Sequence, residues 1–309
     1  MTDQEQTGTP DDAETRCGFV ALIGAPNAGK STLLNALVGT KLAIVTPKVQ
    51  TTRTRLLGVA SEGSSQLIYI DTPGIFQPKR RLDRAMVATA WQGAADADVT
   101  LWLVDAKRGL DDSAKSIAEA LTRDNRKVDL VLTKTDLIKP EQLLPLSGQI
   151  NDIAPINETF MISAPRNEGM DELRKYLEAS VPPGPWHFPD DTLTDQASRI
   201  LAAELTREAL FLKLHQELPY GLAVETESWE EKEDGSVRIG QVIYVQRANH
   251  KAMVIGKGGQ MIKSVGEAAR VQIAELLDQP VHLFLHAKVQ ENWADDPDHY
   301  RAIGLPFNV

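Results

Sequence analysis

The sequence predicts an α/β fold with a doubly wound, mainly parallel sheet, followed by a smaller α+β domain. Strand-length apolar segments lie at residues 18–23, 66–70, 99–104, 128–132 and 159–162. Amphipathic segments of helical length lie at residues 30–38, 82–95, 112–122, 142–153 and 170–179. Strands and helices that alternate in this way form a mainly parallel sheet with helices on both faces.

A proline-rich stretch at residues 181–189 ends this alternation, because proline cannot continue a helix. Trp186 and Phe188 within it predict a linker that docks on a surface. Beyond it we expect a helix at 198–216, strands at 221–229 and 236–246 joined by an Asp-Gly turn, an apolar strand at 253–255, a helix at about 259–277 and a strand at 281–289. We therefore divide the chain into a disordered tail (1–15), a first domain (16–180), a linker (181–198) and a second domain (199–309).

The composition is that of a globular, cytoplasmic protein. Of the 309 residues, 42% are apolar and 25% are charged, and no apolar stretch approaches the roughly 20 residues that a membrane-spanning helix needs. The N-terminus is polar and acidic, unlike a secretion signal. The single cysteine, Cys17, can close no internal disulfide, which fits a reducing compartment. The net charge of −10 argues against a chain coated with nucleic acid.

A phosphate-binding loop connects the first strand to the first helix. It matches the pattern G-x-x-x-x-G-K-[ST] and reads Gly24, Ala25, Pro26, Asn27, Ala28, Gly29, Lys30 and Ser31, followed by Thr32. The glycines allow backbone N–H groups to turn toward phosphates, and the helix N-terminus adds partial positive charge. We expect Lys30 to reach the β- and γ-phosphates of a nucleoside triphosphate and Ser31 to ligate Mg²⁺. A purely structural turn would need neither side chain.

A second string, Asp71-Thr72-Pro73-Gly74, follows the apolar segment at 66–70. Ligands bind at the carboxyl ends of strands in open α/β sheets. We expect Asp71 to be a further partner of Mg²⁺ and Gly74 to offer its N–H to the γ-phosphate. A capping aspartate is the alternative interpretation of Asp71.

A third string, Thr133-Lys134-Thr135-Asp136, ends the segment at 128–132. A carboxylate such as that of Asp136 can accept hydrogen bonds from the N1–H and N2–H₂ groups of guanine, whereas adenine would leave it unpaired. Lys134 can lay its alkyl stem along the base. The three strings together predict a GTPase, which cleaves GTP to GDP and phosphate.

These strings, in this order, resemble the translation-factor-related class of GTPases. The class pattern for the third string is N-K-x-D, so Thr133 stands where an asparagine is usual. The resemblance implies that Ser163 and Ala164 support the base through backbone N–H groups, with Pro165 where a lysine is usual.

The same resemblance implies that a threonine between the first two strings binds Mg²⁺ and the γ-phosphate. We favour Thr52 over Thr51 for this role. The expected catalytic residues are then Lys30, Thr52 and Gly74, and the expected metal ligands are Ser31, Thr52 and Asp71.

The residue after Gly74 is Ile75, where many GTPases have a glutamine that orients the attacking water. Intrinsic hydrolysis should therefore be slow or helped by another group. In related GTPases with Pro-Asn in the phosphate loop, the asparagine helps to hold a potassium ion, which would neutralise charge in the transition state. We accordingly expect K⁺ as a second cofactor beside Asn27. A loop residue that only makes hydrogen bonds is the alternative.

In the second domain, residues 254–263 resemble the G-x-x-G loop of KH RNA-binding domains. The glycines allow a nucleic-acid backbone to approach closely, and the lysines supply positive charge. The expected RNA-binding residues are Ile255, Gly256, Lys257, Gly258, Gly259 and Lys263. Residues 241–290 hold six basic but only three acidic side chains, which supports an anionic ligand. A structural turn is the alternative.

A GTPase domain followed by a KH domain resembles the Era-like family of bacterial GTPases over about residues 16–305, including the strings at 212–220, 281–285 and 291–296. The resemblance implies an assembly factor for the 30S ribosomal subunit whose KH domain binds RNA near the 3′ end of 16S rRNA. It also implies that GTP favours the RNA-binding arrangement and that the protein associates peripherally with the inner membrane. We expect a monomer.

Two alternatives remain open. A P-loop kinase that phosphorylates a small molecule would need neither Asp136 nor the KH-like loop. An RNA-binding protein with a purely structural nucleotide domain would not need Lys30, Ser31, Asp71 and Gly74 together. Phosphate release with and without RNA separates the second alternative from a GTPase, and transfer of label to a small acceptor would indicate the kinase.

Overall fold

The computed structural model describes residues 15–48, 51–78, 80–214, 221–291, 297, 300 and 305–307. Some expectations fall outside these residues. The predicted tail lies outside except for Thr15, and so do Val49 and Gln50, which precede the two candidate threonines. Of the two family strings at 212–220 and 291–296, residues 215–220 and 292–296 also lie outside the described residues.

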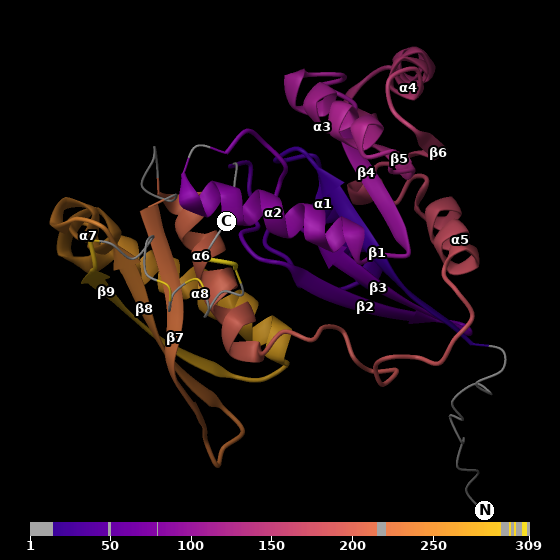
Figure 1. The fold of residues 1–309 in the computed structure, drawn as a ribbon. Helices are drawn as coiled ribbons and strands as arrows, with labels where there is room; N and C mark the ends of the chain where they lie inside the picture. The colour runs from indigo at the N-terminus through magenta and orange to yellow at the C-terminus, as the bar shows by residue number, and fades with distance from the viewer. Residues whose placement is uncertain are drawn as a thin grey trace, which may run out of the picture.

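The first domain is built on a six-stranded sheet with helices on both faces (Figure 1). Its strands are β1 (Arg16–Gly24), β2 (Leu56–Glu62), β3 (Ser65–Asp71), β4 (Val99–Asp105), β5 (Val128–Thr133) and β6 (Ile156–Met161). Its helices are α1 (Lys30–Val38), α2 (Arg81–Ala95), α3 (Asp112–Arg123), α4 (Leu143–Asn151) and α5 (Met170–Ser180). The strand order is β2-β3-β1-β4-β5-β6, and only the β2–β3 pair is antiparallel. The predicted mainly parallel α/β fold is confirmed.

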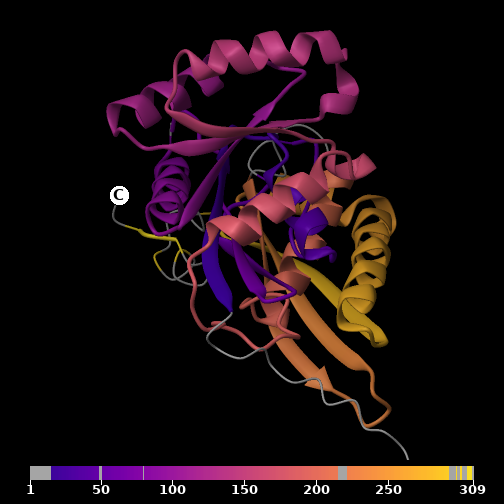
Figure 2. The ribbon, with the colours of Figure 1, turned by 90° about the vertical axis from the view of Figure 1, so that its right-hand side faces the viewer.

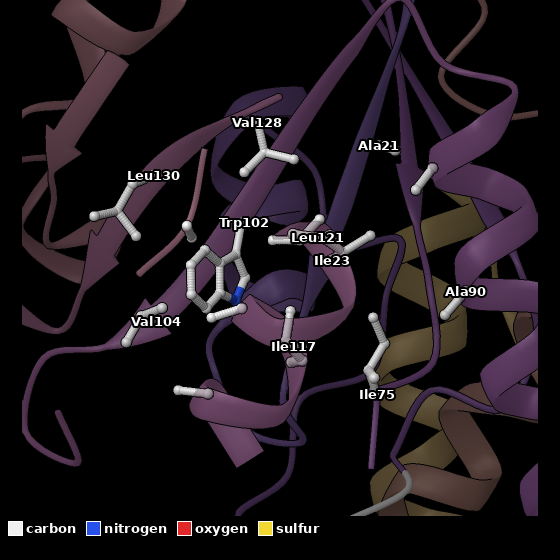
Figure 3. Packing of buried hydrophobic residues seen from close by; sticks show 14 of the residues in the cluster. Ala21, Ile23, Ile75, Ala90, Trp102, Val104, Ile117, Leu121, Val128 and Leu130 are labelled. Carbon is white, nitrogen blue, oxygen red and sulfur yellow. The ribbon is translucent and has the colours of Figure 1, made fainter. Parts of the chain in front are cut away.

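Two apolar layers enclose this sheet. Ala21 and Ile23 of β1 face the layer formed by α2, α3 and α4, whereas Val20 and Leu22 face α1 and α5. In the first layer, Trp102 of β4 lies among side chains of the strands and of α3 (Figure 3). Strands buried on both faces consist of continuous apolar runs. Their carboxyl ends meet at one edge of the sheet, where the three sequence strings begin.

The second domain is an α+β unit with one three-stranded sheet. Its elements are α6 (Ser198–Lys213), β7 (Leu222–Glu231), β8 (Val237–Val245), α7 (Ala248–Ile255), α8 (Gln260–Leu277) and β9 (Val281–Val289). β7 and β8 form the predicted antiparallel hairpin, and β9 pairs with β8 in parallel. The helix α6 lies between this sheet and the first domain (Figures 1 and 2). Within the described ranges, no helix is long and apolar enough to cross a membrane.

The predicted apolar strand at 253–255 is wrong, because these residues form the last turn of α7. A short apolar run cannot be assigned to a strand or a helix from periodicity alone. Gly256 ends the helix with a φ of 74°, so the glycine loop joins two helices. The loop is therefore flanked by two helical segments that can both present side chains to a ligand.

The linker docks on the first domain, as Trp186 and Phe188 predict. The Trp186 indole N–H donates to the Ser64 carbonyl at 3.2 Å, and Phe188 packs against the first apolar layer. The side-chain oxygen of Gln66 accepts the backbone N–H groups of His187 and Phe188, each at 3.0 Å. These contacts hold the linker against β3.

Further along, the linker covers the edge strand β2. The Val59 N–H donates to the Leu193 carbonyl at 2.8 Å, and the Thr194 hydroxyl donates to the Leu57 carbonyl at 2.6 Å. The side chain of Gln196 donates to another carbonyl just before β2. The linker thus follows the first domain almost to the start of α6.

Residues near the C-terminus pack on α2. Tyr300 is fully buried in an apolar cluster with Ala85 and Met86. Its ring meets that of Phe307 edge-on, with centroids 5.1 Å apart, and Arg81 lies 4.5 Å from the Phe307 centroid. The end of the chain therefore returns from the second domain to the first.

Candidate functional site

The phosphate loop lies between β1 and α1 with the backbone that its glycines require. Gly24 and Gly29 have φ values of 150° and 97°. A Cβ atom on Gly24 would lie 2.5 Å from the Leu103 carbonyl oxygen of the neighbouring strand. Glycine is therefore required at position 24, both for its backbone conformation and for the close approach of β4.

Lys30, at the start of α1, lies across this loop. Its ammonium donates to the carbonyl oxygens of Gly24 and Ala25, each at 3.1 Å. Burial lowers its pKa to about 8, and the negative charge of Asp71 opposes this shift. A buried ammonium held by weak neutral acceptors is suited to bind an incoming phosphate.

The three residues expected to serve Mg²⁺ meet at one point. The Ser31 hydroxyl donates to Asp71 Oδ2 at 2.7 Å and lies 2.9 Å from the Thr52 hydroxyl oxygen. Thr52 also donates to Asp71 Oδ2, at 3.2 Å. Thr51, the less favoured candidate, instead bonds the Lys48 carbonyl and lies 2.8 Å from the Thr46 hydroxyl. Of the two threonines, Thr52 is the one that faces the cluster.

The chemistry of this cluster fits a magnesium ion. Asp71 is fully buried, and its Oδ1 atom has no hydrogen-bond partner among the described residues. Burial raises the pKa of this carboxyl, and the Lys30 charge together with hydrogen bonds from Ser31 and Thr52 opposes the shift. Hydroxyl and carboxylate oxygens are the donors that Mg²⁺ prefers.

The second string is packed tightly against the phosphate loop. The Thr72 hydroxyl donates to the Leu22 carbonyl at 2.7 Å, and Pro73 lies between Thr72 and Gly74 in the same buried stretch. A Cβ atom on Gly74 would lie 2.8 Å from Pro26. Ile75 is buried in the first apolar layer. The residue after Gly74 is therefore a core residue, which explains why it is not a glutamine.

The third string and the segment after β6 form the other end of the site. The Thr133 hydroxyl donates to the Ala28 carbonyl at 2.7 Å, so it ties β5 to the phosphate loop. The Lys134 ammonium donates to the Asn27 carbonyl at 2.8 Å. Ser163 is buried and donates its hydroxyl to Asp136 Oδ1 at 2.8 Å, which fixes the carboxylate expected to bind guanine. Ala164 directly follows, at the start of a short helical turn.

Sequence reasoning missed Asp105 and Arg108. Asp105 Oδ2 lies 2.7 Å from the Lys134 ammonium, and Arg108 donates to the Pro26 carbonyl at 3.2 Å. Asp105 ends the apolar strand β4 just as Asp71 ends β3, so its position was a signal that could have found it.

One open cleft of about 390 Å³ lies over the phosphate loop and the segment with Thr52, whereas Asp136, Ser163 and Ala164, expected at the base, are not among its lining residues. Its walls come from the phosphate loop, the segment before β2, the second and third strings, and the loop after β4. The lining residues are Pro26, Asn27, Gly29, Lys30, Ser31, Thr32, Ile44, Val45, Thr46, Pro47, Thr51, Thr52, Gly74, Arg108 and Lys134. The size suits a nucleotide.

The glycine loop of the second domain lies at the junction of α7 and α8. Gly258 and Gly259 have φ values of 60° and 78°, and no described atom lies within 4 Å of a Cβ built on either. Lys257 belongs to the loop itself and Lys263 to the first turn of α8, whose N-terminus adds partial positive charge. Ile255 precedes the loop and is half-buried. An open backbone between two helices leaves space for a phosphate chain.

Two families match separate parts of this chain. Residues 19–134 match the family described as 50S ribosome-binding GTPase, and residues 217–294 match the KH domain family. The fold and the phosphate site agree with both matches. The protein is therefore a P-loop GTPase with a C-terminal KH domain.

Full-length relatives narrow this class. The GTPase Era of Bradyrhizobium sp. (strain BTAi1) is 56% identical over 307 residues, which are 99% of each chain. A variant of Aquifex aeolicus Era bound to GDP and AlF₄⁻ aligns with a TM-score of 0.88 and 37% identity, covering 94% of this chain and 99% of the other. The chain belongs to the Era family of GTPases.

A second solved structure has particular bearing on the two domains. Era in complex with MgGDPNP and nucleotides 1506–1542 of 16S ribosomal RNA aligns with a TM-score of 0.89 and 38% identity, over 94% of this chain and 99% of that one. These matches favour neither a small-molecule kinase nor a purely structural nucleotide domain.

Proposed function

We propose that this protein is a GTP-dependent switch that binds the 3′ end region of 16S rRNA and assists maturation of the 30S ribosomal subunit. The proposal depends on the similarity of this protein, over 94% of its chain, to a protein whose structure was solved with both MgGDPNP and a 16S rRNA segment bound. The nucleotide cleft and the open glycine loop of this chain support it, because each suits one of those two ligands.

We assign the roles in the cleft as follows. Lys30 binds the β- and γ-phosphates, Ser31 and Thr52 hold Mg²⁺ with Asp71 behind them, and Gly74 binds the γ-phosphate. Mg²⁺ would neutralise phosphate charge during cleavage. Asp136 reads guanine. The remaining contacts come from Gly24, Ala25, Pro26, Asn27, Ala28, Gly29, Thr32, Thr72, Pro73, Thr133, Lys134, Ser163 and Ala164.

The proposal also covers the oligomeric state and location, a second cofactor, the domain division and the RNA contacts. We propose a monomer that acts in the cytoplasm and associates peripherally with the inner membrane, as the family resemblance implies. We propose K⁺ as a second cofactor beside Asn27. We also propose the division at residues 16–180, 181–198 and 199–309, which the docked linker supports. In the second domain, RNA would contact Ile255, Gly256, Lys257, Gly258, Gly259 and Lys263.

The test is binding of a short single-stranded RNA from the 3′ end of 16S rRNA, with GTP analogue, GDP or no nucleotide. We expect the tightest binding with the analogue. The variant Gly258→Asp should lose at least about tenfold in affinity, because it places a negative charge beside the RNA backbone.

The matched control is Gly258→Asn. Asn and Asp have the same shape and both tolerate positive φ, so the two variants differ only in charge. Near wild-type binding by Asn and loss by Asp would support the proposal. Absence of RNA binding by the wild type in every nucleotide state would contradict the ribosomal role and leave the GTPase assignment in place.

A further inference from the structure

The segment between α1 and β2, residues 39–55, carries Thr52 and is in contact with the second domain. Ile44 is buried, and its side chain packs in the core cluster of the second domain rather than in that of the first. Ala202, Leu205 and Ala209 of α6 belong to the same cluster. This part of the nucleotide cleft is thus anchored to α6, the first helix of the second domain.

Glu208 of α6 forms the first polar anchor. Only 1% of this residue is exposed. Its carboxylate accepts the Val45 backbone N–H at 2.7 Å and the Lys41 ammonium at 2.6 Å. A buried carboxylate is costly unless its partners are well placed, so these two bonds fix the geometry on both sides of Ile44.

Arg207 forms the second anchor, next to Thr52 itself. Only 2% of it is exposed, and its guanidinium pairs with Glu204 and donates to the Thr51 carbonyl oxygen. That carbonyl belongs to the peptide bond between Thr51 and Thr52. Because a peptide unit is planar, the direction of this carbonyl constrains where the Thr52 residue lies.

Two residues, one on each side of Thr51 and Thr52, complete the attachment to the second domain. The Lys48 ammonium donates to the carbonyl oxygens of Phe211 and Leu214, at the carboxyl end of α6. The Arg53 guanidinium donates to the Leu222 carbonyl at 2.7 Å. Residues 45, 48, 51 and 53 are therefore all bonded to the second domain, whereas Thr52 faces Ser31 and Asp71.

We propose that Arg207 and Glu208 are positioning residues for GTP hydrolysis. They hold the segment before β2 so that the Thr52 hydroxyl points into the magnesium cluster of the other domain. This inference rests on the proposed role of Thr52 in binding Mg²⁺ and the γ-phosphate. It assigns to α6, a helix of the second domain, an effect on the nucleotide site through the segment before β2.

The test uses the full-length protein and compares Arg207→Gln with Arg199→Gln. Arg199 lies on the same helix and is exposed, and its side chain makes no hydrogen bond or ion pair with the described residues; its backbone carbonyl accepts a bond from Thr226. We expect Arg207→Gln to lower the rate of GTP hydrolysis and the affinity for a GTP analogue about tenfold, the effect of losing one charge-assisted hydrogen bond. Affinity for GDP should change less than about twofold, because Thr52 acts on the metal and γ-phosphate. Arg199→Gln should match the wild type.

A second variant, Lys48→Met, distinguishes the proposed effect from misfolding of the Arg207→Gln protein. Lys48→Met keeps the apolar stem of the side chain and removes its bonds to α6, and it should show the same selective loss for the analogue. A merely structural defect would weaken GDP and analogue together. The double variant Arg207→Gln/Thr52→Ala should resemble Thr52→Ala alone. Both changes abolish the same contact, that of the Thr52 hydroxyl with the metal and the γ-phosphate, so their effects should not add.

The inference is overturned if Arg207→Gln leaves analogue binding and hydrolysis unchanged. It is also overturned if this variant weakens the affinities for GDP and for the analogue equally, or if its effect adds to that of Thr52→Ala. If Thr52→Ala itself behaves as the wild type, the proposed magnesium site fails and the inference fails with it. Loss in Thr52→Ala without loss in Arg207→Gln refutes the positioning role alone.

Discussion

At the scale of single residues, the departures from the family pattern have structural reasons. Thr133 uses its hydroxyl to bond the phosphate loop and the Val104 carbonyl, so it links two strings, and we propose that Asp136 alone recognises the base. Ile75 replaces a water-orienting glutamine because its side chain completes an apolar layer. Hydrolysis must then be assisted by groups other than the residue after Gly74.

Asn27 is suited to provide such assistance by holding K⁺. It lines the cleft, has a φ of 64°, and its amide N–H donates to the Pro47 carbonyl across the cleft. Amide and carbonyl oxygens are ligands that K⁺ accepts. We expect hydrolysis to be several-fold faster in potassium than in sodium buffer of equal ionic strength, and Asn27→Ala to remove the difference. Steady-state phosphate release measures both, and equal rates in the two salts would refute the assignment.

At the scale of elements, the sequence predicted the buried parallel strands and their helices well. Each buried strand is a continuous apolar run, and each helix has one apolar face, which are strong signals. β2 was missed because Gly58, Ser61 and Glu62 interrupt its apolar run, so it lacks the continuous pattern of the central strands. α7 was read as a strand because only its last turn is apolar. Arg207 and Glu208 resemble ordinary helix charges in the sequence, and only packing of the two domains reveals their burial.

Gly256 is the residue on which the α7–α8 junction depends. Its φ of 74° and ψ of 174° lie in a region that only glycine adopts readily, and an added Cβ would lie 2.6 Å from that of Met261. We expect Gly256→Ala to destabilise the second domain by about 3 kcal/mol. Gly258→Ala, in open space at a φ of 60°, should cost about 1 kcal/mol. Urea unfolding measures the loss of stability in each variant. Equal unfolding midpoints for Gly256→Ala and Gly258→Ala would contradict the expected difference between the two positions.

At the scale of the whole molecule, the described residues of the second domain contact the first through α6, through Gln272 of α8 and through the residues near the C-terminus. α6 meets the segment that carries Thr52, and residues near the C-terminus pack on α2, which follows the second string. Movement of the second domain would therefore act on the segment that carries Thr52, which lines the nucleotide cleft, and on the helix that follows the second string. This arrangement gives RNA binding a physical route to the GTPase site.

The C-terminal contact can be tested through stability. Tyr300→Ala removes a fully buried ring from the cluster on α2, and we expect it to destabilise the protein by about 3 kcal/mol. The melting temperature should fall by several degrees. Val271→Ala, at a half-exposed position on α8, serves as the control and should change it little. A melting temperature that is unchanged in Tyr300→Ala would show that the cluster contributes nothing to the fold.

The docked linker also determines where the molecule can bend. Residues up to Gln196 are bonded to the first domain, and α6 begins at Ser198. If the contacts of α6 with the first domain were released, the hinge for a rotation of the second domain would lie at Ala197, between the docked linker and the helix. A motion large enough to peel the linker away would uncover the unpaired edge of β2, which invites pairing with another chain.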